Sequence, residues 1–358
     1  MHLAIDASRT TAARITGTER YALELLRAMI WQNSGHALHL YYRDTPPPAL
    51  LPESSQAAHH ILPFPRAWTH LRFAAALWQS RPDVTFVPAH TLPFAFPGKA
   101  LVTVHDLGYK LFPQAHPVSS RLYLDLTTRY SASRATHVLA DSQATADDLM
   151  RFYGTPARKI HVVYPGVFAP LVLDAAAVRD KYNLPERYFL FLGTLQPRKN
   201  IARIVQAYTQ YRQHSADPAA LVLAGGKGWL YDPAWVEGAA GVQMIGYIDE
   251  VDKGALYANA LALVFTTLYE GFGFPVLEAM HCGTPVIAST TSSLPELTGE
   301  AGLLVDPTDT AAIAAAMQQI ETDTGLRAAL REKGYPQAQK FTWKAAAAQV
   351  WDVIEAMG

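Results

Sequence analysis

The chain has 358 residues, which is long enough for two domains of ordinary size. Hydrophobic residues make up 50% of it and charged residues 17%, a composition typical of globular proteins and not of disordered ones. The net charge is −1, and the sequence has neither a basic run nor a recognisable base-reading motif, so nucleic acid is excluded as an expected partner.

In the first half of the chain, short apolar runs alternate with helical patterns, as in a parallel sheet that is covered on both faces. A helix is predicted after Gly17, with Thr18 as its N-cap. A second helix is predicted near residues 119–134, and a third after Asp141 and Ser142. Strands are predicted at residues 3–5, 38–42, 84–87, 101–104 and 137–140, and the segment 162–167 ends this sheet.

The second half repeats the plan, and glycine and proline beside its short apolar runs favour strands over helix fragments. These strands are predicted at residues 188–192, 221–224, 242–245, 261–265, 285–288 and 303–305. Residues 169–179 are predicted as a connector, and a last helix beginning near Phe341 could cross back onto the first domain. We therefore predict an α/β protein with two doubly wound, Rossmann-like domains facing each other across a cleft, residues 1–168 and residues 169–340, followed by a C-terminal helix in residues 341–358.

Cysteine content and charge distribution indicate the cellular compartment and the kind of partner. The single Cys282 excludes an intrachain disulfide and favours a reducing compartment. The first residues lack a basic leader, and no apolar stretch reaches the ~18 residues of a membrane span, so we expect a cytoplasmic protein. Residues 1–168 carry 16 Lys and Arg against 11 Asp and Glu, a net +5, whereas the remainder carries 14 against 20, a net −6. The basic half could attract an anionic acceptor or the inner face of an acidic membrane, with chance scatter of surface charge as the alternative.

One nine-residue motif points to a sugar-nucleotide site. It follows the strand predicted at 261–265 and reads Glu270-Gly-Phe-Gly-Phe-Pro-Val-Leu-Glu278. Gly271 and Gly273 let the backbone approach a ligand closely, and Pro275 suits the first position of a helix. The N–H groups at the start of that helix suit a phosphate, so that one carboxylate can face a sugar and the other a ribose diol. The alternative is an acidic loop followed by an ordinary helix.

A second motif brings cations to the same edge of the predicted sheet. It follows the strand at 188–192 and reads Gly193-Thr-Leu-Gln-Pro-Arg198-Lys199-Asn200. Arg198 and Lys199 could neutralise a leaving diphosphate, since a hydrogen bond to a charged group contributes about 1.5–3 kcal/mol. Ligands of doubly wound sheets lie at the carboxyl ends of strands, where this turn, the glutamate motif and the turn after residue 245 all occur. The alternative is a solvated basic turn in which Asn200 merely caps the next helix.

These motifs, with the downstream Ser293-Leu-Pro-Glu296, resemble those of the retaining GT-B glycosyltransferases with a Glu-x7-Glu signature, a large family that includes many bacterial mannosyl- and glucosyltransferases. The likeness covers most of residues 160–320 and is specific for fold and reaction type. It implies catalytic roles for His105, Arg198, Lys199 and Glu270. It also implies donor-binding roles for Gly17, Thr18, Gly193, Tyr247, Ile248, Gly271, Phe272, Gly273, Phe274, Leu277 and Glu278.

His105 ends the strand predicted at 101–104, where members of the family often have a histidine near the donor sugar. We assign it to sugar positioning rather than to proton abstraction, and expect Asp106 to orient its ring. The alternative is a histidine that only satisfies a backbone carbonyl group. His90 receives no role. Gly17 stands alone where the family usually has several glycines, so its contacts with a diphosphate stay open.

The resemblance also implies the chemistry. We expect no cofactor and no metal ion, because the chain has no Asp-x-Asp pair and no histidines at metal-ligand spacing. GDP-mannose is the expected donor, with UDP- or ADP-sugars as alternatives, and the expected acceptor is a glycan or a lipid-linked glycan. Retention by a front-face mechanism is expected, with the leaving phosphate taking the acceptor's proton. The segment 64–73 is a candidate acceptor contact, but Trp68, Leu71 and Phe73 fit core packing better.

Two other classes of function remain open from the sequence. A sugar-nucleotide epimerase or a phosphorylase on the same fold would share the cleft and the phosphate turn, although Glu270 and Glu278 fit a transferase better. A non-catalytic two-domain sugar-binding protein would not need Arg198 and Lys199.

Overall fold

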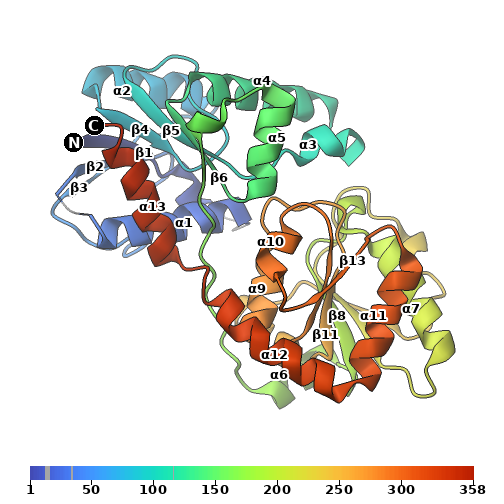
Figure 1. Ribbon diagram of the computed structural model, residues 1–358. Helices are drawn as coiled ribbons and strands as arrows, with labels where there is room; N and C mark the ends of the chain where they lie inside the picture. The colour runs from blue at the N-terminus through green and yellow to red at the C-terminus, as the bar shows by residue number, and fades with distance from the viewer. Residues whose placement is uncertain (13–16, 34, 116) are drawn as a thin grey trace. The chain divides into compact units, whose positions relative to one another are not determined.

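The computed structural model describes residues 1–12, 17–33, 35–115 and 117–358 (Figure 1). The chain forms two compact units. The first comprises Met1–Gly166 together with Phe341–Gly358, and the second comprises Val167–Lys340.

The described strands of the first unit form one parallel sheet in the order β3-β2-β1-β4-β5-β6-β7. Their bounds are β1 His2–Asp6, β2 Ala37–Tyr42, β3 Ala57–Ile61, β4 Val84–Val87, β5 Lys99–Val104, β6 His137–Ala140 and β7 Ile160–Val162. All four residues of β4 are buried, as expected of a parallel strand that is covered on both faces. The edge strand β3 is half exposed and carries two histidines, so it lacks the apolar run that would predict it.

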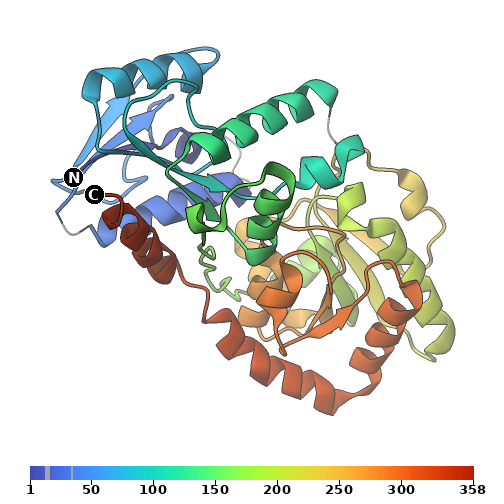
Figure 2. The same ribbon diagram turned by 45° about the horizontal axis from the view of Figure 1, so that its top comes forward.

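Helices cover both faces of this sheet. On one face α1 (Gly17–Trp31) lies beside α13 (Trp343–Glu355), and the indole Nε1 of Trp351 donates a hydrogen bond to the carbonyl oxygen of Met29 at 3.2 Å (Figure 2). The other face carries α2 (Ala74–Ser80), α4 (Val118–Arg134) and α5 (Gln143–Tyr153), which share one hydrophobic core with the strands (Figure 1). The remaining short helical segments of this unit are Ser8–Thr11, Thr69–Phe73, α3 (Gly108–Leu111), Pro113–Ala115 and Ala157–Lys159.

The second unit repeats this architecture around a parallel sheet in the order β10-β9-β8-β11-β12-β13. Its strands are β8 Tyr188–Leu192, β9 Ala220–Ala224, β10 Val242–Gly246, β11 Ala262–Phe265, β12 Val286–Ser289 and β13 Leu303–Val305. From β8 the chain runs outward through β9 and β10, and it then returns to β11 on the other side of β8. Because β8 and β11 are parallel neighbours, the loops that follow them lie next to each other.

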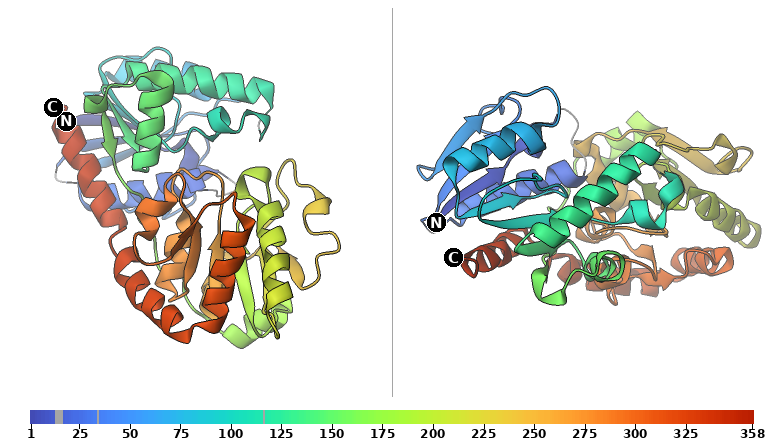
Figure 3. Two further views of the ribbon diagram at one scale, coloured as in Figure 1. Left: turned by 45° about the vertical axis from the view of Figure 1, so that its right-hand side comes forward. Right: turned by 90° about the horizontal axis from the view of Figure 1, so that it is seen from above.

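The helices of the second unit also form two layers (Figure 3). On one face α7 (Ile201–His214) packs against α11 (Thr310–Thr322). The other face carries α8 (Lys253–Asn259), α9 (Phe274–His281) and α12 (Thr324–Ala338). The unit also contains α6 (Ala175–Tyr182), α10 (Leu294–Thr298) and the short turns Pro197–Lys199, Pro233–Trp235 and Glu250–Asp252.

The structure corrects three local predictions. Helix α1 already includes Gly17, so Thr18 belongs to its first turn and is not the residue that caps it. The expected connector at 169–179 contains the start of α6, whose N-cap Asp174 accepts hydrogen bonds from the backbone N–H groups of Ala176 and Ala177. Leu71, which was predicted to pack in the core with Trp68 and Phe73, is 58% exposed, whereas those two residues are buried.

Candidate active site

An ion pair joins the two sequence motifs of the second unit. Lys199 ends the turn Pro197–Lys199 after β8, and Glu270 lies in the loop after β11. Lys199 Nζ lies 2.6 Å from Glu270 Oε1, and the two side chains are only 12% and 9% exposed. The ammonium group also lies 5.0 Å from the ring centroid of Phe265, at the end of β11. The structure thus brings a cation and a carboxylate together at the carboxyl edge of the sheet.

Asn200 holds the cationic turn in place. Its backbone is left-handed, with φ of 64°, and its side-chain Nδ2 donates to the carbonyl oxygens of Thr266 at 2.8 Å and Pro307 at 2.7 Å. The carbonyl oxygen of Arg198 accepts a hydrogen bond from the N–H of Leu268. Asn200 is therefore more than a helix cap, since its amide ties the turn to the loops after β11 and β13.

Two glycines precede α9, and only the second of them, Gly273, has a backbone conformation that requires glycine. Gly273 has φ of +125°, and a β-carbon there would lie 2.7 Å from Leu294 Cδ2, so only glycine fits. Gly271 does not have a positive φ. Phe272 is buried, with its ring 5.0 Å from that of the half-buried Phe274. The Leu277 side chain is fully buried, which leaves only its backbone for a ligand.

Two serines after β12 bind the backbone between the glutamates. The Ser292 hydroxyl accepts a hydrogen bond from the N–H of Glu270 at 3.0 Å. The Ser293 hydroxyl donates to the carbonyl oxygens of Glu270, at 3.1 Å, and of Phe272. From the sequence, Ser293 was predicted only as part of the Ser293-Leu-Pro-Glu296 motif, without a role of its own. Ser293 follows β12, which pairs with β11, so the loops after these two strands are neighbours; this proximity could have predicted its contact with the Glu270 loop.

Glu278 lies one turn inside α9 and is 5% exposed. The hydroxyl of Tyr257, on α8, donates to its Oε2 at 2.8 Å. Burial and the neighbouring Glu278 charge raise the pKa of Tyr257 well above its usual value, so the phenol stays a donor. Tyr257 therefore fixes the orientation of the Glu278 carboxylate.

The loops after β8, β9 and β10 meet closely. Gly193 has φ of +153°, and its N–H donates to the carbonyl oxygen of Ala224 at 2.9 Å. A side chain at Gly225 would collide with the Gly193 backbone. After β10, Tyr247 is 73% exposed, whereas the side chain of Ile248 is buried. Of these two predicted donor contacts, only Tyr247 therefore offers an accessible side chain.

In the first unit, His105 is held by an aspartate that was not predicted as its partner. His105 Nδ1 lies 2.7 Å from Asp141 Oδ2, and both residues are buried. Asp106, the predicted partner, instead accepts the N–H of Gly108 at 2.8 Å, so that prediction was wrong. The signal for Asp141 was its place directly after β6, because β6 pairs with β5 and His105 directly follows β5.

The electrostatics of this dyad favour a protonated imidazole. Burial lowers the pKa of His105, but the charge of Asp141 and its hydrogen bond outweigh burial, and the net pKa is raised. Burial likewise raises the pKa of Asp141, against the opposing effect of His105. His90 Nε2 accepts the backbone N–H of His105 at 3.3 Å, and burial followed by repulsion from His105 lowers the pKa of His90. A hydrogen bond between the His105 ring and the backbone of Pro88 also raises the pKa of His105. His105 Nε2 itself is buried.

The remaining predicted contacts lie at the start of α1. Gly17 and Thr18 belong to its first turn, and residues 13–16 lie outside the described part of the chain. The next residue, Glu19, is buried and pairs with Arg9 at 3.3 Å. Two residues after Glu19, the Tyr21 ring meets that of His105 edge-on, with 4.7 Å between centroids. The start of α1 therefore adjoins the His105 dyad.

The described residues contain no group of three or more His, Cys, Asp or Glu side chains arranged to hold a metal ion. In the same part of the chain, no helix combines the length and apolar character needed to cross a bilayer.

The chain matches two family models. Residues 15–168 match the model described as Glycosyltransferase Family 4, and residues 175–337 match the one described as Glycosyl transferases group 1. The chain is 31% identical over 356 residues to the O-antigen chain mannosyltransferase B of Escherichia coli, covering 92% of this chain and 93% of that one. It is 29% identical to the serotype-specific mannosyltransferase WbdA of Escherichia coli over 72% of this chain, and spans 33% of the length of that relative.

Solved structures of similar fold include sucrose-phosphate synthase from Thermosynechococcus elongatus, with a TM-score of 0.76, 24% identity, and coverage of 99% of this chain and 98% of that one. Anabaena HepE in complex with UDP-glucose superimposes with a TM-score of 0.74 at 17% identity, covering 99% of this chain and 100% of that one. Given these likenesses and two α/β units with parallel sheets, the chain belongs to glycosyltransferase family 4, with the GT-B fold, and is a glycosyltransferase.

Proposed function

We propose that this enzyme transfers mannose from GDP-mannose to a glycan or lipid-linked acceptor, with retention of anomeric configuration and without a divalent cation. The buried Lys199–Glu270 pair beside the start of α9 is the observation that carries the proposal. Similarity to mannosyltransferases, among them an O-antigen chain mannosyltransferase with 31% identity, supports mannose as the sugar. UDP-glucose in a structure of similar fold supports a nucleoside diphosphate sugar as the class of donor.

The diphosphate is the leaving group, and its developing negative charge needs stabilisation. In our proposal Arg198 and Lys199 supply the positive charge, and the backbone N–H groups at the start of α9 supply further donors. A hydrogen bond to a charged partner contributes about 1.5–3 kcal/mol, and a helix terminus about 0.3–1 kcal/mol. These groups perform, in the proposal, the neutralisation that a divalent cation performs in other transferases.

In the proposal, the two glutamates and His105 form hydrogen bonds with the two sugars of the donor, which are the mannose and the ribose on either side of the diphosphate. Glu270 accepts hydrogen bonds from mannose hydroxyls while it remains paired with Lys199, and Glu278 accepts them from the ribose diol. The imidazole of His105, which its pair with Asp141 keeps protonated, donates to a hydroxyl of the transferred sugar. The acceptor attacks from the face that the diphosphate leaves, and the departing phosphate oxygen takes the acceptor's proton.

The test is a transfer assay with GDP-mannose, UDP-glucose and ADP-glucose as donors, run with and without EDTA. GDP-mannose is expected to give the highest kcat/KM, an α-linked product by NMR, and the same rate in EDTA. Preference for another donor, an inverted product, or loss of activity in EDTA would each overturn the corresponding part of the proposal. Release of GDP at the full rate without acceptor would favour the epimerase or phosphorylase alternatives, and a covalent mannosyl adduct on Glu270 would exclude the front-face mechanism.

A membrane contact through the first unit is a separate part of the proposal. Val118, Leu122 and Leu126 recur at helical spacing along α4 and are 59–61% exposed. The neighbouring turn Thr69–Phe73, which contains the exposed Arg72, joins this surface, because its His70 Nε2 hydrogen-bonds the Tyr123 hydroxyl at 3.1 Å. Apolar side chains beside a basic residue suit the headgroup region of an anionic bilayer.

Vesicle co-sedimentation tests this contact. The enzyme is expected to bind vesicles with phosphatidylglycerol more strongly than pure phosphatidylcholine vesicles, and the variant Leu122→Ser/Leu126→Ser is expected to lose most of this binding. Leu171→Ser is the matched control, because Leu171 is 72% exposed in the second unit. Equal binding by the α4 double variant and the wild type would refute a contact at α4.

A further inference from the structure

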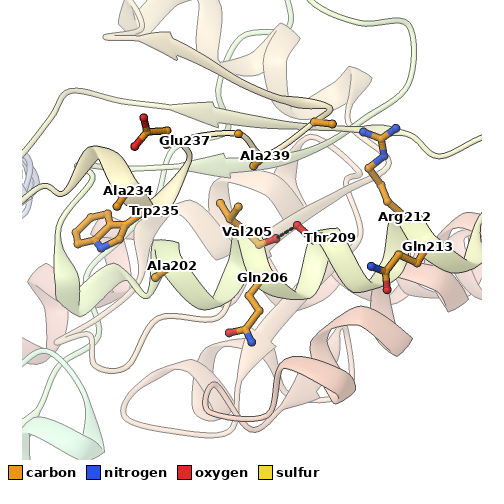
Figure 4. Close-up of a pocket in the computed structure, with 12 residues that line it drawn as sticks. Ala202, Val205, Gln206, Thr209, Arg212, Gln213, Ala234, Trp235, Glu237 and Ala239 are labelled. Atoms are coloured by element: carbon orange, nitrogen blue, oxygen red, sulfur yellow. Dashed lines mark hydrogen bonds between the residues drawn. The ribbon is translucent and has the colours of Figure 1, made fainter.

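A groove of about 700 Å³ lies along α7 in the second unit, between this helix and the segment 234–240 that precedes β10. Its α7 side is formed by Ala202, Val205 and Thr209, which share one stripe of the helix, and Ala239 lies opposite them (Figure 4). These short side chains leave the groove open along its length.

The two ends of the groove differ in chemistry. Trp235 lies at one end, half-buried, with its ring edge-on to that of Tyr231 at 5.6 Å between centroids. Arg212 lies at the other end (Figure 4), where a β-carbon at Gly241 would lie 2.8 Å from its Nη1, so glycine leaves room for the guanidinium. Neither Arg212 nor Glu237, which also lines the groove, has an ion-pair partner among the residues the structure describes.

Size and chemistry fit an oligosaccharide. Ten residues separate Ala202 from Arg212, about 15 Å at 1.5 Å per residue, which is the length of roughly three pyranose rings in a linear chain. A pyranose offers a C–H face that packs on an aromatic ring, and hydroxyl edges that bind guanidinium and carboxylate groups. A helical peptide would need a hydrophobic groove without Arg212 and Glu237, and a nucleic acid would be repelled by Glu237.

The groove begins beside the candidate active site. Ala202 is the second residue of α7, which starts directly after the turn that ends at Lys199. Gln196, just before that turn, accepts a hydrogen bond at 3.1 Å from the indole Nε1 of Trp229, which is 48% exposed. Trp229 thus contacts the segment before the turn, and Tyr231 contacts Trp235 at the end of the groove.

We propose that this groove binds about three sugar residues of the acceptor glycan and thereby keeps a long acceptor at the enzyme between transfers. The inference rests on the proposed function only for the identity of the sugars.

Binding of mannobiose, mannotriose and mannotetraose to the full-length enzyme, followed by NMR and calorimetry, tests the groove without any turnover. Affinity is expected to rise up to three or four sugars and to fall about tenfold in Trp235→Ala, with partial rescue in Trp235→Phe. Arg212→Leu is expected to weaken binding as well. Trp31→Ala is the matched control, because Trp31 is 79% exposed in the first unit.

Kinetics give the second readout. Trp235→Ala is expected to raise KM for a long acceptor about tenfold, with kcat and the KM for a monosaccharide acceptor unchanged. Unaltered binding in both Trp235→Ala and Arg212→Leu, or equal effects on long and short acceptors, would overturn the proposal. If oligosaccharides bind the groove but no donor supports transfer, the proposed function fails and the groove stands; if transfer proceeds and the groove variants behave as wild type, only the groove fails.

Discussion

Replacement of Lys199 by methionine removes the positive charge of the Lys199–Glu270 pair and keeps the length of the side chain. In the wild type the two groups lie 2.6 Å apart, and the carboxylate side chain is only 9% exposed. The variant leaves that carboxylate without its cation in a site that water reaches poorly. Both the stability of the second unit and its affinity for a diphosphate are therefore expected to fall.

The size of the effect follows from burial. Removal of one partner of a buried pair costs about 3–5 kcal/mol, because an uncompensated charge remains. The second unit runs from residue 167 to 340, which is 174 residues, and a unit of this size shifts its Tm by about 2–4 °C per kcal/mol. Lys199→Met should thus lower Tm by about 6–20 °C, whereas Lys199→Met/Glu270→Gln should lie much closer to the wild type.

Four proteins form a double-mutant cycle: the wild type, Lys199→Met, Glu270→Gln and the double variant. Denaturant titration and calorimetry of these proteins measure the free energy of interaction between Lys199 and Glu270. Lys333→Met is the control, because its pair with Glu300 is 3.5 Å long with side chains 55% and 92% exposed, and such pairs contribute little. Binding of GDP, measured by calorimetry, should weaken about 10- to 150-fold in Lys199→Met, the equivalent of 1.5–3 kcal/mol. If the stability losses of the two single variants simply added in the double variant, a stabilising interaction between Lys199 and Glu270 would be refuted. Unchanged affinity for GDP in Lys199→Met would refute the role of Lys199 at the diphosphate.

Three further changes probe the geometry around the site. Gly273→Ala should destabilise the second unit and abolish GDP binding, since φ of +125° and Leu294 exclude a β-carbon; Gly226→Ala, at a glycine with open space, should leave both unchanged. Ser293→Ala should cost about 1–3 kcal/mol in denaturant titration, because it leaves two loop carbonyl groups without their buried donor; wild-type stability would contradict this. In Asp141→Asn, NMR titration should find the pKa of His105 lowered, since the largest effect that opposes burial is then removed and only the smaller effects of Asp106 and the Pro88 backbone remain. Because folding raises the pKa of His105, the wild type should lose stability as pH rises above the ordinary histidine value of about 6.5, and Asp141→Asn should lose less. Identical pH profiles would argue against the dyad.

Much of the fold could be read from local patterns. Strands such as β8 and β9 are predicted almost to the residue, because parallel strands that are buried on both faces are continuous apolar runs. The edge strand β3 was missed, because its outer positions face solvent and carry histidines. The Thr18 cap was placed wrongly, since a threonine beside a glycine suits either a cap or a first turn, and only the backbone conformation distinguishes them.

The sequence by itself determined the family, the parallel α/β architecture and the residue types of the site, because each depends on short segments whose spacing is visible along the chain. Only the tertiary structure paired Lys199 with Glu270, 71 residues away, and replaced Asp106 by Asp141 as the partner of His105, 36 residues away. Only the tertiary structure also brought Ser292 and Ser293 into hydrogen bonds with the backbone of Glu270. The physical reason is that strand order decides which loops become neighbours at the carboxyl edge of a parallel sheet, and that order is set by packing between segments far apart in the chain.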